Sequence, residues 1–240
     1  MSTLRVFTFS ADWGLPTTGP FSLKLLAWMR LAGLSYELKE QNDPSKGPLG
    51  KVPWVEIDGR PMADSELIIA ELGRRHGFDV DAGLSPVQAA DAHAWRRAFE
   101  EGFHQVLEWE LFIHPAGAAY VERLIAGMAP PLVRSIVTAK LRGHFRKQLQ
   151  ARGLGRHAPS VVADKGRADI DALAARLADR PYLVGDGPSM ADLAVFGQVA
   201  PMVRWPMATP VAQHAKAQKP VVDFVERVFD RCFEASRAAA

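Results

Sequence analysis

A predicted β-hairpin in residues 54–63 places the tightest constraint on what this chain can fold into. Val55 and Ile57 alternate with their neighbours, as side chains do on a strand with one buried face. The dipeptide Asp58-Gly59 follows, and it is typical of a two-residue type I′ turn because glycine adopts positive φ at little cost. We therefore expect two antiparallel strands here, which commits this part of the chain to a sheet.

The residues that flank the hairpin predict a helix and an unusual backbone conformation. Asp64-Ser65 precedes an apolar run with helical spacing, and either side chain would cap the free N–H groups of that helix. Pro53 directly precedes the first strand, where proline is tolerated only at the first position, in a bulge or in a special turn. We interpret Pro53 as a cis-proline that exposes the backbone of Val52, with the Asp64-Ser65 helix start facing the same point.

Composition and charge are those of an ordinary globular protein. The chain has 240 residues, 48% of them apolar and 23% charged, a length that allows one large domain or two small ones. A formal net charge of +2 gives no argument for a nucleic acid or membrane partner. No apolar run reaches the roughly 18–20 residues of a membrane span. The N-terminus lacks a signal-peptide core and Cys232 is the single cysteine, so we expect a cytoplasmic protein, with a composition that hints at a bacterial source.

The first 77 residues follow the order of a thioredoxin-like domain. Besides the hairpin, alternation and helical spacing predict strands at 4–9 and 35–40 and helices at 21–32 and 66–76. The resulting order, βαβ, loop, ββα, is that of an α/β domain with a mixed four-stranded sheet. We place this domain at residues 1–77 and a linker, rich in glycine and proline, at residues 78–86.

Residues 87–240 predict an all-helical second domain. Helical spacing is present at 89–109, 116–128, 132–152, 161–178, 190–203 and 221–233. Most prolines of this half, from Pro115 to Pro220, fall between these segments, as helix breakers should. The expected architecture is therefore an α/β domain followed by an all-α one.

This architecture and three motifs resemble the glutathione transferase fold superfamily. The motifs are Lys51-Val52-Pro53, Asp64-Ser65 and the segment 187–194, Gly-Pro-Ser-Met-Ala-Asp-Leu-Ala. In the last of these, Ser189 and Asp192 have the spacing of a capping box at the start of a buried helix. Segments 19–25, 28–34, 146–157 and 166–169 are more closely similar to the branch that contains the failed-axon-connections and metaxin-like proteins and their bacterial relatives.

The resemblance implies a binding site for glutathione. The residue before the cis-proline, here Val52, pairs its backbone with the cysteinyl unit, and Asp64-Ser65 at the helix start hold the γ-glutamyl end. Lys51 is placed to reach the glycyl carboxylate. The alternatives stay open, because any thioredoxin-like fold needs Pro53 and a helix cap, and Lys51 is equally well explained as a solvated surface residue.

The catalytic position departs from the pattern that the resemblance implies. Relatives carry a thiol or hydroxyl at the start of the first helix to stabilise the glutathione thiolate, and this chain has Gly19 there. Thr18 and Ser22 are the candidate partners of the thiolate, and backbone N–H groups at Phe21 would assist. An ordinary helix-capping role for either hydroxyl is the alternative.

The resemblance also implies an acceptor site for a small electrophile beside this position. Trp13 in the preceding loop and His104, Glu108 and Trp109 on the first long helix are the candidate lining residues, with packing as the alternative. The histidines show no spacing typical of a metal site, so we expect no metal. Glutathione as the substrate is what the resemblance implies.

Two functions are therefore carried forward. The first is a glutathione transferase that conjugates the glutathione thiolate to a small electrophile, and the second is a non-catalytic protein of the same fold that binds a ligand or partner. Thiol–disulfide exchange is disfavoured because the chain has no Cys-x-x-Cys motif. The resemblance also implies a homodimer, without a nucleic acid or membrane partner.

Overall fold

The first part of the chain forms a mixed four-stranded sheet, in agreement with the sequence prediction. In the computed structural model, which describes residues 4–128 and 131–234, the strand order is β2-β1-β3-β4. β1 pairs with β2 in parallel and with β3 antiparallel, and β3 pairs with β4 antiparallel. The strands are β1 (Leu4–Thr8), β2 (Glu37–Glu40), β3 (Trp54–Ile57) and β4 (Arg60–Ala63).

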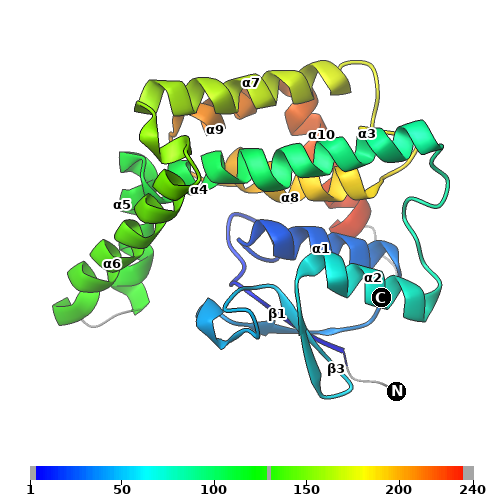
Figure 1. Cartoon of the computed structure of the whole chain (residues 1–240), viewed down its shortest axis with the longest axis horizontal. Coiled ribbons are helices and arrows are strands. Elements are labelled where there is room, and N and C mark those ends of the chain that lie inside the picture. Colours follow the sequence, from blue (N-terminus) through cyan, green and yellow to red (C-terminus); the bar gives the residue numbers. More distant parts are fainter. Residues whose placement is uncertain (1–3, 129–130, 235–240) are drawn as a thin grey trace.

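The turn between β3 and β4 has the predicted conformation. Asp58 and Gly59 both have positive φ, 54° and 76°, as a type I′ turn requires. Two helices, α1 (Pro20–Leu31) and α2 (Ser65–His76), lie on the side of the sheet that faces the rest of the molecule (Figure 1). The sheet and these helices form the predicted thioredoxin-like half.

The rest of the described chain is helical. Its elements are α3 (Pro86–Arg97), η2 (Ala98–Phe103), α4 (His104–Phe112), α5 (Pro115–Met128), α6 (Pro131–Ala151), η3 (Leu154–Arg156), α7 (Pro159–Leu177), α8 (Met190–Arg204), α9 (Pro210–Ala217), α10 (Lys219–Phe229) and η4 (Asp230–Glu234); a further short helix, η1 (Pro44–Lys46), precedes β3. The helix predicted at 89–109 is a continuous run of α3, η2 and α4, in which η2 is a π-helical insertion.

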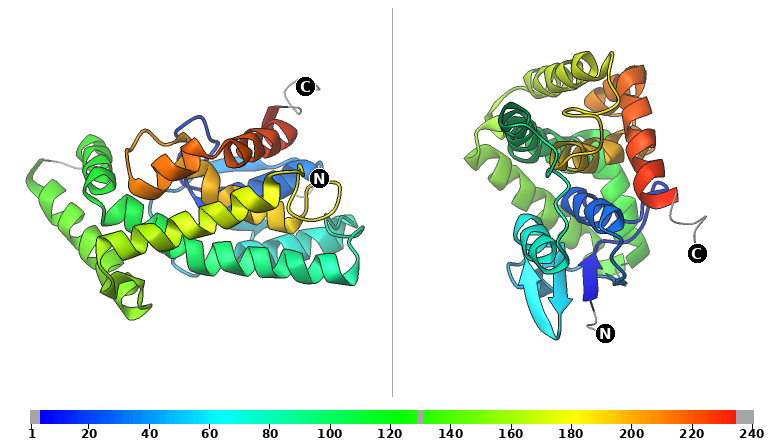
Figure 2. Two further views of the ribbon diagram at one scale, coloured as in Figure 1. Left: turned by 90° about the horizontal axis from the view of Figure 1, so that it is seen from above. Right: turned by 90° about the vertical axis from the view of Figure 1, so that its right-hand side faces the viewer.

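Helix α8 is the centre of the molecule. Residues 190–202 are all buried, and α1 packs directly against this helix (Figure 2). The contact is close because Gly197 has no side chain, and a Cβ there would lie 2.4 Å from the Pro20 carbonyl oxygen. The start of α1 therefore has a fixed position relative to the helical half.

The predicted capping box at the start of α8 is confirmed. The Ser189 hydroxyl accepts from the Asp192 N–H at 3.4 Å, and the Asp192 carboxylate accepts from the Ser189 N–H at 2.8 Å. The same carboxylate accepts from the Leu183 N–H at 2.8 Å, which fixes the loop before the helix.

Helix α9 is not predicted by the sequence. Its segment lies between closely spaced prolines, and the side chain that supports its start comes from α4. The fully buried Glu110 carboxylate accepts from the N–H groups of Val211 and Ala212, at 2.9 and 3.1 Å. A carboxylate at a helix N-terminus stabilises it, but a partner 101 residues away leaves no local sequence signal.

In the part of the chain that the structure describes, every helix is too short or too polar to cross a lipid bilayer.

Candidate functional site

The loop before β3 presents an unpaired backbone segment. The Val52–Pro53 peptide bond is cis, Pro53 is buried and Val52 is half-buried. Within the described residues, the N–H and C=O of Val52 make no backbone hydrogen bond. Because such groups are strong donors and acceptors, this pair suits an extended peptide-like ligand. Lys51 beside it is exposed.

At the start of α2, the two residues of the predicted Asp64-Ser65 pair have different roles. Asp64 is the cap: its carboxylate accepts from the N–H groups of Glu66 and Leu67, at 2.9 and 3.2 Å. Its φ of 73° lies in the left-handed region, a conformation with a cost for residues other than glycine that is often found at functional sites. Ser65 is the first helical residue and is 7% exposed. The Asp64 carboxylate is thus engaged in capping, while Ser65 remains for a ligand.

The start of α1 separates the two predicted catalytic hydroxyls. Thr18 is half-buried, and its side chain makes no hydrogen bond within the described part of the chain. Ser22 is 0% exposed, and its hydroxyl likewise lacks a partner among the described residues. A Cβ on Gly19 would lie 2.9 Å from the Ser22 Oγ, so Ser22 sits directly behind Gly19. Of the two hydroxyls, only that of Thr18 is accessible from outside.

Thr17 lies two residues before Gly19, which is the N-cap residue of α1. The Thr17 hydroxyl, which is fully buried, accepts from the Gly19 N–H at 3.2 Å. Gly19 itself brings no side chain to the helix start, so the first N–H groups of α1 are without a side-chain cap. Because Pro20 has no N–H, the first of these groups belong to Phe21 and Ser22.

His104 and Glu108 belong to one polar cluster on α4. The Glu108 carboxylate is 3.4 Å from His104 and 2.8 Å from Arg152 at the end of α6. Burial alone would raise the pKa of Glu108, but the His104 hydrogen bond and the charges of His104, Arg152 and Lys51 hold it below its ordinary value. The influence of Lys51 shows that this cluster lies within electrostatic reach of the Pro53 loop.

His104 also reaches the first helix. Its ring is 4.9 Å from that of Phe21 in α1, and its Nδ1 is 2.9 Å from the Gln198 Oε1 in α8. His104 and Glu108 therefore lie where the two halves of the molecule meet, on the side of the α1 start. The role of His104 and Glu108 in lining an acceptor site stays a prediction.

Trp13 fastens the loop that leads to α1. Its indole N–H donates to the Tyr120 hydroxyl of α5 at 2.9 Å, and that hydroxyl donates to Asp12. The Trp13 ring also packs edge-on against Trp205. These contacts tie the loop to the helical half on two sides, so Trp13 has a structural role.

Trp109 is placed in a core cluster and not at an open surface. Its side chain is 6% exposed and packs with Leu149 and Val162, between α4, α6 and α7. The prediction that Trp109 borders the acceptor site therefore has no support, since helical phase turns its ring away from α1. The half-buried Trp95 ring packs against that of Phe99, with the ring centroids 5.9 Å apart.

The sequence prediction missed a buried ion pair next to the site. Lys24 of α1 and Glu100 of η2 form a salt bridge with side chains 2% and 7% exposed. The charge of Lys24 also lowers the pKa of Glu66 in the first turn of α2, after the larger contribution of the Arg96 hydrogen bond. The available signal was Lys24 among the apolar residues of α1, the helix that also contains Ser22.

Among the described residues, a surface concavity and the possible metal ligands give no further candidate site. A concavity of about 570 Å³ lies between the hairpin and the last turns of α2, lined by Ile57, Arg60, Met62 and Glu71 among others, and it contains no predicted site residue. In the described ranges, the His, Cys, Asp and Glu side chains form no cluster of three that is suited to a metal ion.

Two family sequence models match this chain. That of the glutathione S-transferase N-terminal domain matches residues 20–117, and that of the glutathione S-transferase C-terminal domain matches residues 166–228. The chain belongs to the glutathione transferase superfamily. The two matches cover both halves of the fold, including α1, the Pro53 loop, the start of α2 and helix α8.

Individual members of the superfamily are similar over most of the chain. An isoprene-epoxide–glutathione S-transferase from Rhodococcus sp. (strain AD45) is 28% identical over 94% of this chain and 97% of its own length. Failed axon connections from Drosophila melanogaster is 26% identical over 96% of this chain, which spans 58% of that protein. Metaxin-1 from Mus musculus is 25% identical over 82% of this chain, with 64% of its length matched.

Solved structures confirm the fold. The beta-etherase LigF from Sphingobium sp. strain SYK-6 matches with a TM-score of 0.66 at 19% identity, over 99% of this chain and 100% of that one. Glutathione S-transferase III in its apo form matches with a TM-score of 0.61 at 17% identity, over 99% and 96% of the two chains.

Proposed function

We propose that this protein binds glutathione and conjugates its thiolate to a small electrophile. The observation that carries this proposal is the start of α1, where an accessible Thr18 hydroxyl and uncapped N–H groups surround a glycine. Membership of the superfamily supports glutathione as the substrate. No metal takes part in the proposed reaction.

Glutathione binding is assigned to the thioredoxin-like half. The N–H and C=O of Val52 pair with the cysteinyl unit, in the manner of an added strand. The buried N-terminus of α2 at Ser65 receives the γ-glutamyl carboxylate, because helix N-termini attract anions. Lys51 is exposed and takes the glycyl carboxylate as a point charge. Asp64 acts by positioning Ser65 through its cap.

The chemistry is assigned to the start of α1. A thiol there loses its proton to solvent more readily than a free thiol of pKa about 8.5, since the helix N-terminus and the Thr18 O–H favour the thiolate. The thiolate sulfur then forms a bond to carbon of the electrophile while the bond from that carbon to its leaving group breaks. With an epoxide, the departing oxygen stays attached to the product and takes a proton from water.

The most direct test of this chemistry is the pKa of the glutathione thiol in the complex. Ultraviolet absorbance of the thiolate, titrated in the complex with glutathione, is expected to show a thiol pKa at least one unit below 8.5. Thr18→Val should raise that pKa, whereas Thr18→Ser should leave it unchanged. An unshifted thiol pKa in the wild-type complex would remove the enzyme proposal and leave the binding site intact.

Binding itself has a separate test. Ser65→Ala should weaken glutathione binding in calorimetry by about tenfold, because one charge-assisted hydrogen bond contributes roughly 1.5 kcal/mol. Glu71→Ala, farther along α2, serves as the control for helix stability. If the wild-type protein shows neither heat of binding nor a thermal shift with millimolar glutathione, the glutathione site is absent.

The second candidate is a non-catalytic protein of this fold. Gly19 at the position where relatives hold a thiol or hydroxyl favours it, and so does similarity to Failed axon connections and metaxin-1. The thiol titration separates the two functions, since a binding protein needs no lowered thiol pKa.

The substrate class and assembly are further parts of this proposal. The similarity to an isoprene-epoxide–glutathione S-transferase makes small epoxides the first electrophiles to assay, with styrene oxide as the probe. We also propose a cytoplasmic homodimer, for which light scattering should give about twice the chain mass of 26.3 kDa.

A further inference from the structure

The charges of this chain are segregated, although they nearly cancel overall. Residues 123–163 contain eight Lys and Arg residues and neither Asp nor Glu. The remaining residues carry 21 Lys and Arg against 27 Asp and Glu. The net charge of +2 therefore conceals a cationic segment. The overall net charge does not decide which kind of partner binds this segment.

Most of this segment forms a projecting arm. Helices α5 (Pro115–Met128) and α6 (Pro131–Ala151) lie side by side and extend from one end of the molecule (Figures 1 and 2). The Phe145 ring stacks on that of Phe112 at 3.6 Å and fastens α6 to the end of α4. With 21 residues, α6 is about 31 Å long, and much of its surface faces solvent.

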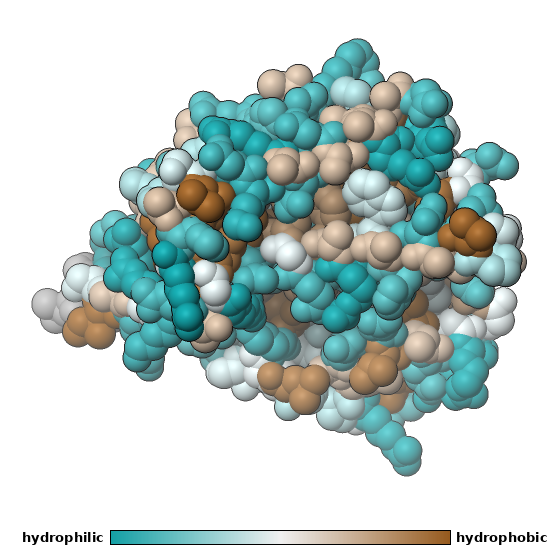
Figure 3. Space-filling view, turned by 45° about the horizontal axis from the view of Figure 1, so that its top comes forward, coloured by the Kyte–Doolittle hydropathy of each residue, from teal (hydrophilic) through white to brown (hydrophobic). Residues whose placement is uncertain are grey.

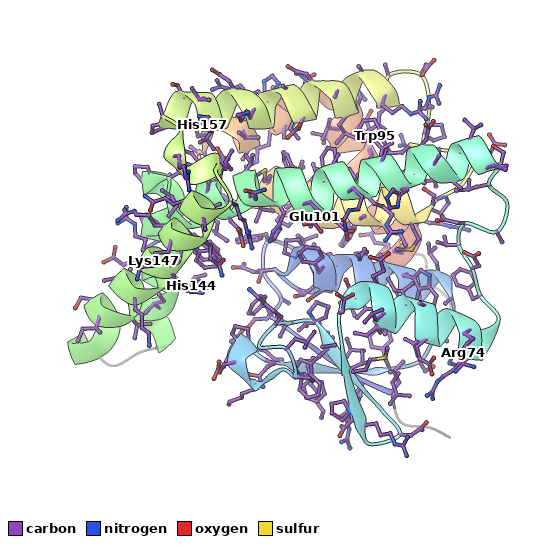
Figure 4. The ribbon with its side chains drawn as sticks, in the orientation of Figure 1. Arg74, Trp95, Glu101, His144, Lys147 and His157 are labelled. Atoms are coloured by element: carbon purple, nitrogen blue, oxygen red, sulfur yellow. The ribbon has the colours of Figure 1, made fainter. Side chains whose placement is uncertain are left out.

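Four cations of α6 are exposed and form no ion pair within the described part of the chain. Lys140, Arg142, Arg146 and Lys147 are all exposed, and no acidic partner for these four lies among the described residues. Figure 4 shows Lys147 on the arm, together with His144. Arg152 at the inner end differs, because it pairs with Glu108. Unpaired cations on a projecting helix favour an anionic partner.

Aliphatic side chains accompany the cations toward the outer end of the arm. Leu124, Ile136 and Val137 are 42%, 66% and 42% exposed. Val137 and Lys140 are three residues apart, so they are neighbours on one helical face. Figure 3 shows brown, hydrophobic atoms at the far end of the arm, next to teal ones. The arm is thus apolar at its outer end and cationic along its length.

We propose that this arm binds the surface of an anionic phospholipid bilayer. The aliphatic side chains enter the boundary between headgroups and acyl chains, and the Lys and Arg side chains contact headgroup phosphates. A nucleic acid would match the charge but would leave the aliphatic side chains in water. A small anion would use only a fraction of the charges spread along α6. The proposal revises the expectation of no membrane partner and is independent of the glutathione site.

Vesicle co-sedimentation of the whole protein tests this proposal. We expect binding to 70:30 phosphatidylcholine–phosphatidylglycerol vesicles at 0.1 M salt, little binding to pure phosphatidylcholine, and loss of binding at 0.5 M salt. Lys140→Glu with Lys147→Glu should lower the partition coefficient about tenfold or more. Ile136→Ser with Val137→Ser should lower it several-fold without changing retention by polyanionic resin.

The control is a charge reversal of equal size elsewhere. Lys46→Glu with Arg60→Glu changes the same net charge at two exposed positions of the thioredoxin-like half, and it should bind vesicles almost as the wild type does. Circular dichroism establishes that all variants are folded. The proposal is overturned if the wild type does not bind anionic vesicles, if the two double reversals weaken binding equally, or if duplex DNA binds and vesicles do not.

Discussion

Gly19 lacks the expected hydroxyl, and its surroundings restrict which other residue can stand at this position. Its φ of −83° is open to any residue, so the backbone does not require glycine. The space around Gly19 does favour glycine, because a Cβ would lie 2.9 Å from the Ser22 Oγ and 3.1 Å from the Phe9 ring. Ser22 thus fills the volume behind position 19, and a thiol or hydroxyl cannot be restored there without moving it.

This packing predicts coupling between Gly19 and Ser22. Ser22→Ala removes a buried hydroxyl that has no partner in the described structure, so it should leave the free energy of unfolding unchanged or raise it by up to about 1 kcal/mol. Gly19→Ala should lower it by about 1 kcal/mol, and the double variant by less than the sum. Urea denaturation measures all three, and strictly additive values would contradict the contact.

The capping box adds a pH dependence at the scale of one residue. Burial raises the pKa of Asp192 to about 6, although Ser189 and Leu183 donate to its carboxylate. An aspartate in an unfolded chain has a pKa of about 3.9. The folded state therefore binds this proton more tightly, so the contribution to stability is complete below about pH 4 and is lost as the pH rises through 6.

Asp192→Asn isolates that contribution. The free energy of unfolding of the wild type minus that of the variant should increase by about 2 kcal/mol as the pH falls from 7 to 4.5. Denaturation in urea at several pH values measures this difference, in which the titration of other carboxyl groups cancels. A difference that grows as the pH rises would show that the carboxylate, and not the acid, is the stabilised form.

At the scale of elements, the site depends on how closely α1 lies on α8. Gly197→Ala would place a methyl group 2.4 Å from the Pro20 carbonyl oxygen, so α1 must shift at its start. We expect a loss of about 2–3 kcal/mol in stability and weaker glutathione binding. Gly143→Ala in α6 is the matched control, because its Cβ meets nothing within 4 Å and should stabilise by about 0.5–1 kcal/mol. Equal effects at both positions would contradict the close contact.

The elements that the sequence predicts well have local signals. The Asp58-Gly59 turn, the Ser189–Asp192 box and the left-handed Gly77 after α2 follow from backbone preferences over a few residues. Helix α9 and the roles within the site do not, since they depend on distant partners. Glu110 reaches α9 from α4, and only tertiary packing decides that Thr18 is accessible, that Ser22 is buried and that Trp109 turns into a core cluster.

At the scale of the whole molecule, two halves of different architecture meet through polar contacts as well as through the apolar packing of α1 on α8. Lys24 on α1 and Glu100 on η2 form an ion pair that is almost fully buried, and the Trp13 loop is tied to Tyr120. The surface that both halves share also carries His104 and Phe21. Relative motion of the halves would therefore separate charges from each other and would move the start of α1.

The ion pair predicts how strongly the halves are coupled. Glu100→Gln leaves the Lys24 cation buried without its carboxylate, which should cost about 3–5 kcal/mol, whereas Lys24→Met with Glu100→Leu should recover most of that loss. Asp223→Asn, at the exposed pair with Lys219, is the control and should change stability by less than about 1 kcal/mol. Urea unfolding followed by tryptophan fluorescence and by circular dichroism should give one coincident transition for the wild type and for Glu100→Gln, at a lower urea concentration in the variant, because one apolar core runs through both halves. A single transition within 1 kcal/mol of the wild type in Glu100→Gln would show that apolar packing between α1 and α8 alone holds the halves together.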